Sequence, residues 1–150
     1  MLTPEQITFR DRAVALAKDI APEFGLDWRL MAATAILESG WGASELARQA
    51  NNFFGVKAGN RTPDDQIHLL RTRRGPVRFR RFKSDEEAFR AYGRLVGGSR
   101  IYARAREAAR EAALEHLVRE IAPRYCPGDP DYALKIMQIV EMIDSLSDAA

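Results

Sequence analysis

The sequence predicts a mainly α-helical protein with a small β-hairpin lobe and a cleft between that lobe and the helical body. Apolar residues recur at helical spacing through most of the chain, whereas only the short runs 66–70 and 77–82 resemble strands. At 150 residues, with 46% hydrophobic and 29% charged residues, the chain suits a single domain, 1–150, around one core. No apolar run approaches the roughly 20 residues that a membrane helix requires, so membrane insertion is not expected.

The first predicted helix begins after Thr3, which can cap it. Pro4 suits the first helical position, and Gln6 completes a capping box. The helix should run to about Glu23, and Gly25 should end it. Its buried face should carry Ile7, Val14, Ala17 and Ile20.

Two further helices are predicted before a long loop. Asp27 caps a helix from Trp28 to about Ser39, and its all-round apolar character places it at the centre of the body. Ser44 with Glu45 opens a short helix that ends near residue 50. Residues 51–65 follow as a loop rich in turn signals.

The hairpin lobe consists of the runs 66–70 and 77–82 around Arg74-Gly75. Pro76 should make their pairing irregular, because proline has no N–H to contribute to a ladder. The capping box at 84–87 then opens a helix to about Val96, where two glycines end it.

The last third of the chain predicts helices again. Residues 100–106 should start one helical segment, and the amphipathic stretch 107–122 should stop at Pro123. Asp129-Pro130 opens the final helix, and residues 147–150 should be frayed. The final helix should turn inward Ile136, Ile139, Val140 and Ile143.

Glu38 is the main candidate for chemistry. It ends the apolar run 30–37, and Ser39-Gly40-Trp41-Gly42 follows at once. An apolar wall disfavours the charged form of a carboxyl group, so Glu38 can keep its proton near neutral pH. Such an acid can donate a proton to a leaving oxygen, as cleavage of a glycosidic bond requires. An exposed Glu at an ordinary helix end is the plainer interpretation of the same residues.

The segment 35–58, AILESGWGASELARQANNFFGVKA, resembles the catalytic segment of the glucosaminidase family of peptidoglycan hydrolases, which includes the muralytic domain of the flagellar rod protein. The matching pieces are 37–42, Ser44, 46–47 and 49–57, with weaker matches at 79–84, 89–92 and 129–133. The resemblance spans roughly residues 2–146. It implies a lysozyme-like fold and endo-cleavage of the glycan next to N-acetylglucosamine, with Glu38 as the acid. Bacterial peptidoglycan is then the expected partner, and no cofactor is expected.

Several residues near Glu38 are candidate site residues. Trp41 and Phe54 would flank the cleft and stack on sugar rings, although Trp41 could equally fill the core. Of Asn51 and Asn52, one should bind acetamido groups and the other should hold the loop. The resemblance places Tyr132 where family members carry a tyrosine that faces the catalytic Glu, and Tyr125 is the second candidate for that role. Helix packing is the alternative for both tyrosines.

The sequence departs from the family in the hairpin. Many members carry a second acid there, and Arg73 occupies that position here. A two-carboxylate mechanism needs a partner at about 5–5.5 Å for retention or about 6.5–9.5 Å for inversion. Asp64 and Asp65 are the nearest acids in sequence. The alternatives are attack by the 2-acetamido oxygen of the substrate, or Glu38 acting alone as acid and then base.

The lobe is also strongly cationic. No acid lies between Asp65 and Asp85, whereas seven cations do: Arg71, Arg73, Arg74, Arg78, Arg80, Arg81 and Lys83. They could form a nucleic-acid patch, attract an anionic cell wall, or simply keep a solvated hairpin from pairing at its edge. The last two interpretations are favoured because no nucleic-acid motif is present, so no nucleic-acid partner is expected.

Other chemistries lack their motifs. His68 and His116 have no further ligands at zinc-binding spacing, so no metal is expected. Cys126, the only cysteine, should be a small apolar filler. No phosphate-binding loop or dinucleotide fingerprint occurs.

Three functions therefore stand: an endo-β-N-acetylglucosaminidase, a muramidase or lytic transglycosylase on the same fold, or a wall-binding module without catalysis. The first is preferred. The missing hairpin acid supports the wall-binding module, and the intact 38–42 motif argues against it. A monomer acting on the cell wall, in the periplasm or outside the cell, is expected. No signal peptide is visible at the N-terminus, so release during phage lysis, transport on a virion or removal of a leader would have to deliver it.

Overall fold

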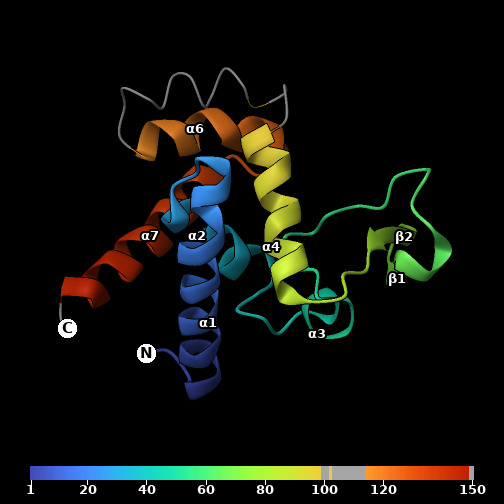
Figure 1. The fold of residues 1–150 in the computed structure, drawn as a ribbon, viewed down its shortest axis with the longest axis horizontal. Coiled ribbons are helices and arrows are strands. Elements are labelled where there is room, and N and C mark those ends of the chain that lie inside the picture. The colour runs from blue at the N-terminus through green and yellow to red at the C-terminus, as the bar shows by residue number, and fades with distance from the viewer. Residues whose placement is uncertain (99–101, 103–113, 149–150) are drawn as a thin grey trace.

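The chain forms a helical body from which a β-hairpin lobe projects to one side, as Figure 1 shows. This computed structural model describes residues 1–98, 102 and 114–148. The mainly helical prediction with a small antiparallel hairpin is confirmed. Within the described ranges, no helix is both long and apolar enough to cross a membrane.

Helix α1 (Pro4–Ile20) begins with the predicted capping box, in which the Thr3 hydroxyl accepts from the backbone N–H of Gln6 at 3.2 Å. It ends earlier than predicted, because the chain tightens into the 3₁₀ helix η1 (Ala21–Phe24), which carries a proline in its first turn. The prediction that Ile7 is buried is wrong: its side chain is 38% exposed. The core instead receives Ala13, Ala17 and Ile20 from α1.

Helix α2 (Trp28–Glu38) is the centre of the body, as predicted. The Asp27 carboxylate caps it by accepting from the backbone N–H of Arg29 at 2.9 Å. Every residue from Leu30 to Ile36 is buried, because α1, α4 and α7 pack around this helix. A sequence that is apolar on all sides is stable only in such a position.

The hairpin lobe is held against helix α3 (Glu45–Ala50). Strands β1 (Ile67–Thr72) and β2 (Gly75–Arg80) are antiparallel, each displaced by a residue or two from its predicted bounds. Pro76 does not disrupt the pairing as expected: it stands opposite Arg71 within the regular register. Pairs in an antiparallel ladder alternate between bonded and non-bonded, and a proline fits where its nitrogen points away from the partner strand.

Helix α4 (Asp85–Gly93) follows the lobe and returns the chain to the body. Ser84 caps it by accepting from the backbone N–H of Glu87 at 3.2 Å, although the Glu87 carboxylate accepts from Lys83 rather than from Ser84. The helix was predicted to reach Val96, but it passes at Arg94 into the π-helical turn η3 (Arg94–Gly98).

Helices α6 (Leu114–Tyr125) and α7 (Tyr132–Asp148) complete the body. The prediction that the helix stops at Pro123 is wrong, because its last turn continues past the proline and Cys126 N–H donates to the Ala122 carbonyl at 2.9 Å. Helix α7 begins two residues after the predicted Asp129-Pro130 and stays helical through residue 148, where fraying was expected. The predicted helical stretches 100–106 and 107–113 and the last two residues lie essentially outside the described residues.

Candidate active site

Glu38 is the last residue of α2, and its side chain is half-buried. Burial is the main cause that raises the pKa of this carboxyl above its ordinary value. The negative charge of Asp129 raises the pKa further, whereas the Tyr132 hydroxyl lowers it. The structure therefore gives Glu38 the raised pKa that the sequence predicts.

A strained turn follows Glu38 and ends the helix there. Gly40, Trp41 and Gly42 have successive φ values of 56°, 60° and 78°, all left-handed. This conformation is uncommon for a bulky residue such as Trp41, and strain of that kind costs about 1–3 kcal/mol. The Ser39 hydroxyl, which accepts from Gly42 N–H at 2.8 Å, helps to hold the turn. A Cβ at Gly42 would lie 2.4 Å from the Phe9 ring, so only glycine fits. Trp41 is half-buried against the core, so its position agrees with either role considered above.

Asn52 fixes the loop that faces Glu38. Its side chain is 1% exposed, and its amide nitrogen donates to the carbonyls of Val56 and Arg80, both at 2.9 Å. Its amide oxygen accepts from Val56 N–H at 3.0 Å. These bonds place Gly55 beside the carboxylate: a Cβ added at Gly55 would lie 3.8 Å from Glu38 Oε2. Asn52 is therefore a structural residue.

The side chain of Asn51 uses less of its hydrogen-bonding capacity than that of Asn52 does. It ends α3 with a left-handed φ of 49°, and its amide nitrogen donates to the Phe82 carbonyl at 3.1 Å. Within the part of the chain that the structure describes, its amide oxygen accepts no hydrogen bond. Of the two asparagines, Asn51 is the one with capacity left for a ligand.

Phe54 does not flank the cleft as expected. It is only 3% exposed, and its ring stacks on Tyr92 with centroids 4.5 Å apart and planes at 17°. It also meets the Phe89 ring edge-on at 5.0 Å. The aromatic side chains of α4 offer Phe54 more contact than solvent does, so Phe54 belongs to the core.

Tyr125 and Tyr132 differ in the hydrogen bonding of their hydroxyl groups. Tyr125 Oη donates to the Phe54 carbonyl at 3.0 Å and so ties α6 to the loop beside Glu38. Tyr132 is 4% exposed, and its buried hydroxyl makes no hydrogen bond of good geometry among the described residues, yet it lies close enough to the Glu38 carboxylate to stabilise its charge. Burial raises the pKa of Tyr132 most, and the Glu38 charge raises it next. A buried hydroxyl normally has a partner, and the Glu38 carboxyl is the group that can serve this one.

Asp129 is the acid that the sequence analysis missed. It precedes α7 by three residues, accepts from Asp131 N–H at 3.0 Å and pairs with Lys135 Nζ at 2.7 Å. Its charge acts on Glu38. The signal was present in the sequence, since Asp129 belongs to the same matching segment as Tyr132.

Asp64 and Asp65 lie in a different place. Both are exposed in the 3₁₀ turn η2 (Asp64–Gln66), which leads into β1. Neither is among the charges that shift the pKa of Glu38. Arg73 is exposed at the tip of the hairpin, between β1 and β2.

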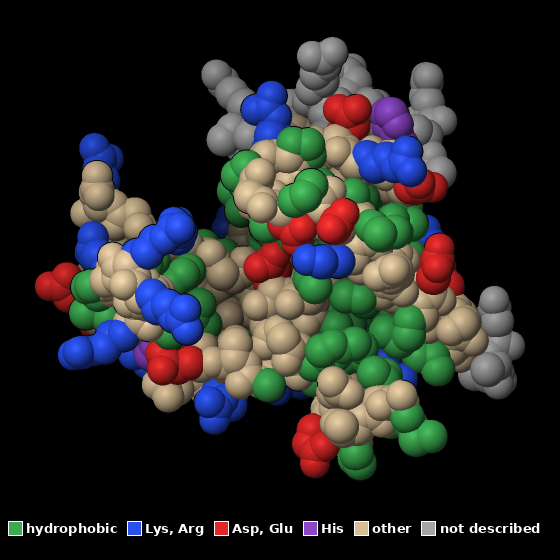
Figure 2. Space-filling view, turned by 180° about the vertical axis from the view of Figure 1, so that it is seen from behind, with side chains coloured by type: hydrophobic (Ala, Val, Ile, Leu, Met, Phe, Trp, Pro, Cys, Tyr) green, Lys and Arg blue, Asp and Glu red, His purple; other side chains and the backbone are tan. Residues whose placement is uncertain are grey.

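A hollow separates the hairpin lobe from the body on the face shown in Figure 2, and cationic side chains cover the lobe. Among the described residues, no group of three or more His, Cys, Asp or Glu could hold a metal ion. His68 instead bonds Glu45 Oε2 at 2.8 Å, and the free thiol of Cys126 packs against the core.

A half-buried acid with a raised pKa, between a helical body and a hairpin lobe, is the arrangement of a lysozyme-like glycoside hydrolase. The family model for glucosaminidases, described as mannosyl-glycoprotein endo-beta-N-acetylglucosaminidase, matches residues 14–145. The chain therefore belongs to the glucosaminidase family.

Characterised relatives agree with this assignment. The chain is 30% identical over 146 residues to the peptidoglycan hydrolase FlgJ of Pseudomonas aeruginosa, covering 90% of this chain and 36% of that protein. It is 31% identical to the exo-glucosaminidase LytG of Bacillus subtilis, covering 93% of this chain and 52% of LytG. The chain thus spans about a third to a half of the curated relatives it matches.

Solved structures of similar size share the fold. The peptidoglycan hydrolase of Sphingomonas sp. A1 aligns with a TM-score of 0.77 at 29% identity, covering 95% of this chain and 94% of that one. The glycoside hydrolase domain of Salmonella typhimurium FlgJ aligns with a TM-score of 0.74 at 27% identity, covering 96% and 91%. These neighbours agree with the lysozyme-like fold that the sequence predicts.

Proposed function

We propose that this chain hydrolyses the glycan strands of bacterial peptidoglycan next to N-acetylglucosamine, with Glu38 as the general acid. The observation that carries the proposal is the half-buried Glu38 carboxyl, whose pKa is raised mainly by burial. Peptidoglycan as the substrate is supported by the relatives, since FlgJ and the Sphingomonas protein are both named peptidoglycan hydrolases.

In the proposed reaction, protonated Glu38 donates its proton to the glycosidic oxygen as the bond to the anomeric carbon breaks. The Tyr132 hydroxyl, which has no other partner, donates to the carboxylate that remains and so stabilises it. Glu38 then takes a proton from the attacking water, which restores the acid. The burial of the Tyr132 hydroxyl and its effect on the pKa of Glu38 support this role.

The mechanism also needs a group that attacks the anomeric carbon. Asp64 and Asp65 stay as candidates, but both are exposed in η2 and neither shifts the pKa of Glu38. We favour a mechanism that depends on Glu38, in which either the 2-acetamido oxygen of the substrate or a water molecule attacks. Trp41 and the amide oxygen of Asn51 are the proposed substrate-binding groups.

The test is digestion of purified peptidoglycan by the wild-type chain and by Glu38→Gln, followed by reduction and mass analysis of the products. We expect reduced N-acetylglucosamine ends that disappear with Glu38→Gln. Internal fragments would indicate endo-cleavage, whereas release of terminal units alone would indicate the exo mode of the LytG name. Glu141→Gln, at an exposed position of α7, is the matched control and should leave activity unchanged.

Other products would contradict the proposal in distinct ways. Muramic or anhydro-muramic ends would place the chain among muramidases or lytic transglycosylases. Wall binding without soluble products from either protein would indicate a binding module. Unchanged lysis by Glu38→Gln would remove Glu38 from the mechanism.

We further propose that the chain acts as a monomer on the wall, outside the cytoplasmic membrane. The relative FlgJ is named a peptidoglycan hydrolase, and peptidoglycan is part of the cell wall, which supports this location. Light scattering of the purified chain, with and without soluble glycan strands, tests the monomeric state.

A further inference from the structure

A cationic groove lies at the base of the hairpin lobe, where loop 56–66 meets β2. Its volume is about 460 Å³. Its lining includes Lys57, Arg61 and Arg80 and no acidic side chain. These cations create a positive potential that an anionic group can neutralise, with Lys57 bordering the groove from the other face of the ladder because it stands opposite Phe79.

The cations of this groove have no acidic partner among the described residues. Ion pairs do occupy exposed arginines elsewhere, such as Arg12 with Asp85 and Arg90 with Glu23. In the groove, the Arg80 guanidinium instead lies 4.8 Å from the centroid of the Phe82 ring. Asp64 and Asp65 are nearby in sequence but do not line the groove. Its charge is therefore available to a ligand.

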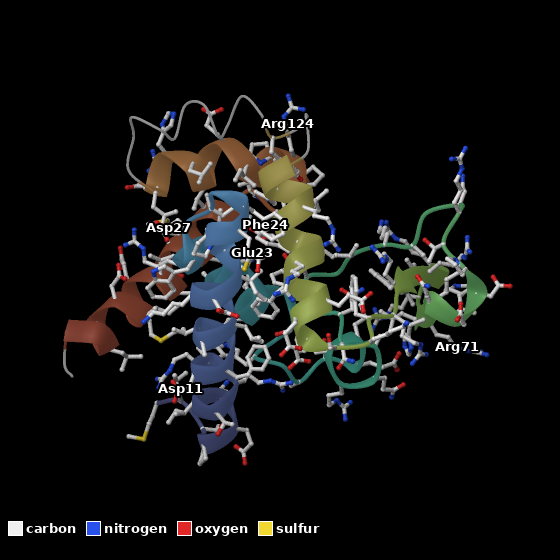
Figure 3. All side chains as sticks on the ribbon, in the orientation of Figure 1. Asp11, Glu23, Phe24, Asp27, Arg71 and Arg124 are labelled. Atoms are coloured by element: carbon white, nitrogen blue, oxygen red, sulfur yellow. The ribbon has the colours of Figure 1, made fainter. Side chains whose placement is uncertain are left out.

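The groove continues onto one face of the hairpin. Residues directly opposite in an antiparallel pair share a face, and the register sets Arg80 opposite Ile67 and Arg78 opposite Leu69. Arg71 is two residues from Leu69 and so lies on that face as well. Figure 2 shows the cations gathered on this lobe, and Figure 3 shows Arg71 on the lobe, far from the helical body.

The groove also adjoins the proposed catalytic acid. Val56 lines it, and the preceding residue, Gly55, is the one whose added Cβ would lie 3.8 Å from Glu38 Oε2. The same loop therefore carries Gly55 beside Glu38 and forms one wall of the groove.

We propose that this groove is a subsite for the carboxylates of the peptide stems carried by the glycan strand. The inference depends on the proposed function, because it assumes that the strand lies with its cleaved bond at Glu38. Guanidinium groups bind carboxylates through two parallel hydrogen bonds, and Lys57 adds a third cation. Peptide stems are attached to the strand itself, so their carboxylates are held close to the cleaved bond.

The test compares the wild-type chain with Lys57→Gln/Arg61→Gln on three soluble substrates. These are glycan strands with peptide stems, the same strands with stem carboxylates amidated, and strands stripped of stems. We expect the double variant to lose roughly tenfold or more in kcat/KM on the first substrate, as expected for charge-assisted bonds, and to match wild type on the other two. Amidation should reduce the wild-type rate to that of the variant.

The matched control is Arg94→Gln/Arg124→Gln, which removes the same net charge at exposed positions near the α4–α6 end of the body. It should behave as wild type on all three substrates. An equal loss for the groove variant on stripped strands, or no loss on strands with stems, would overturn the subsite.

A binding measurement separates this inference from the proposed catalysis. Equilibrium dialysis of strands with stems against Glu38→Gln, with and without the groove substitutions, needs no turnover. Weaker binding with the groove substitutions supports the subsite even if no substrate is cleaved. Unchanged binding would contradict the subsite while leaving the proposed catalysis intact.

Discussion

The pKa of Glu38 depends on the point at which α2 ends. The apolar interior of α2 surrounds one side of the carboxyl, while the left-handed turn at 40–42 stops the helix before it would be covered completely. The group is thus buried enough to favour its protonated form and open enough to reach a substrate. Asp129 strengthens the effect by its charge, and Tyr132 opposes it.

The pH dependence of activity should reflect this balance. A general acid must be protonated, so activity should fall as the pH rises through the raised pKa of Glu38. Asp129→Asn removes a negative charge that raises this pKa, and should therefore move the falling limb of the pH–rate profile to lower pH. The amide keeps an oxygen that can accept from Asp131 N–H, so the turn before α7 should persist. Initial rates between pH 4 and about 9 measure the shift.

Asp131→Asn is the control for that prediction, because Asp131 is exposed and does not act on Glu38. Its profile should coincide with that of wild type. A limb that does not move with Asp129→Asn would show that Asp129 has no electrostatic role at the site.

At the scale of elements, the loop 52–56 and the hairpin are held in place by a few polar contacts. Asn52 connects loop 52–56 to β2, and Tyr125 connects α6 to the same loop. His68, only 7% exposed, joins β1 to α3 through Glu45 and lies 3.3 Å from an Arg81 nitrogen. These contacts position Gly55 and the lobe relative to Glu38.

Asn52→Ala should lower both stability and activity. It leaves the Val56 N–H without its partner and takes one donor each from the carbonyls of Val56 and Arg80, although the Val56 carbonyl still accepts from Arg80 N–H at 2.9 Å. Each unsatisfied buried group costs about 1–3 kcal/mol. We expect a loss of about 2–4 kcal/mol in the free energy of unfolding, measured by urea denaturation. Asn60→Ala, in an exposed turn, should change it by less than about 0.5 kcal/mol.

Glu45→Gln should loosen the hairpin without unfolding the body. The substitution replaces a charged partner of the nearly buried His68 with a neutral one, which weakens the bond between β1 and α3. Hydrogen exchange of the β1 and β2 amides should become faster, while that of the α2 amides stays unchanged. Equal acceleration in both regions would mean that the lobe and body open together.

At the scale of the whole molecule, α2 is the element on which the rest is built. It packs against α1, α4 and α7, and Met31 and Ile36 are fully buried. A close approach between η1 and α4 completes this packing, since a Cβ at Gly93 would lie 2.3 Å from the Phe24 ring. Figure 3 shows Glu23 and Phe24 beside α4, at the end of the body near Arg124.

Ile36→Ala should therefore destabilise the entire fold. The expected loss is about 2–5 kcal/mol in the free energy of unfolding, because a cavity opens where several helices meet. Thermal unfolding should remain a single transition if 1–150 is one domain, as proposed. Leu134→Ala, at a side chain that is 59% exposed, should cost less than about 1 kcal/mol. Two separate transitions would contradict the single domain.

The sequence by itself determined the helix starts at Thr3, Asp27, Ser44 and Ser84, the central position of α2 and the acidic role proposed for Glu38. Each depends on residues that are close in the chain: a capping side chain, an apolar run, a glycine-rich break. Local interactions of this kind are present in the sequence pattern, so they can be predicted from it. The ends of helices are less well predicted from the sequence: α6 continues past Pro123, and α4 passes into a π-helical turn.

Only the tertiary structure decided which side chains reach Glu38. Phe54 is buried in the core because α4 supplies aromatic partners for its ring. The Asn52 side chain holds the loop because Arg80 of β2, 28 residues away, supplies a carbonyl that accepts from its amide. Asp129 influences Glu38 because α7 packs against α2. These outcomes depend on contacts between segments far apart in the chain, and the free energy of such contacts belongs to the packed molecule rather than to any local pattern.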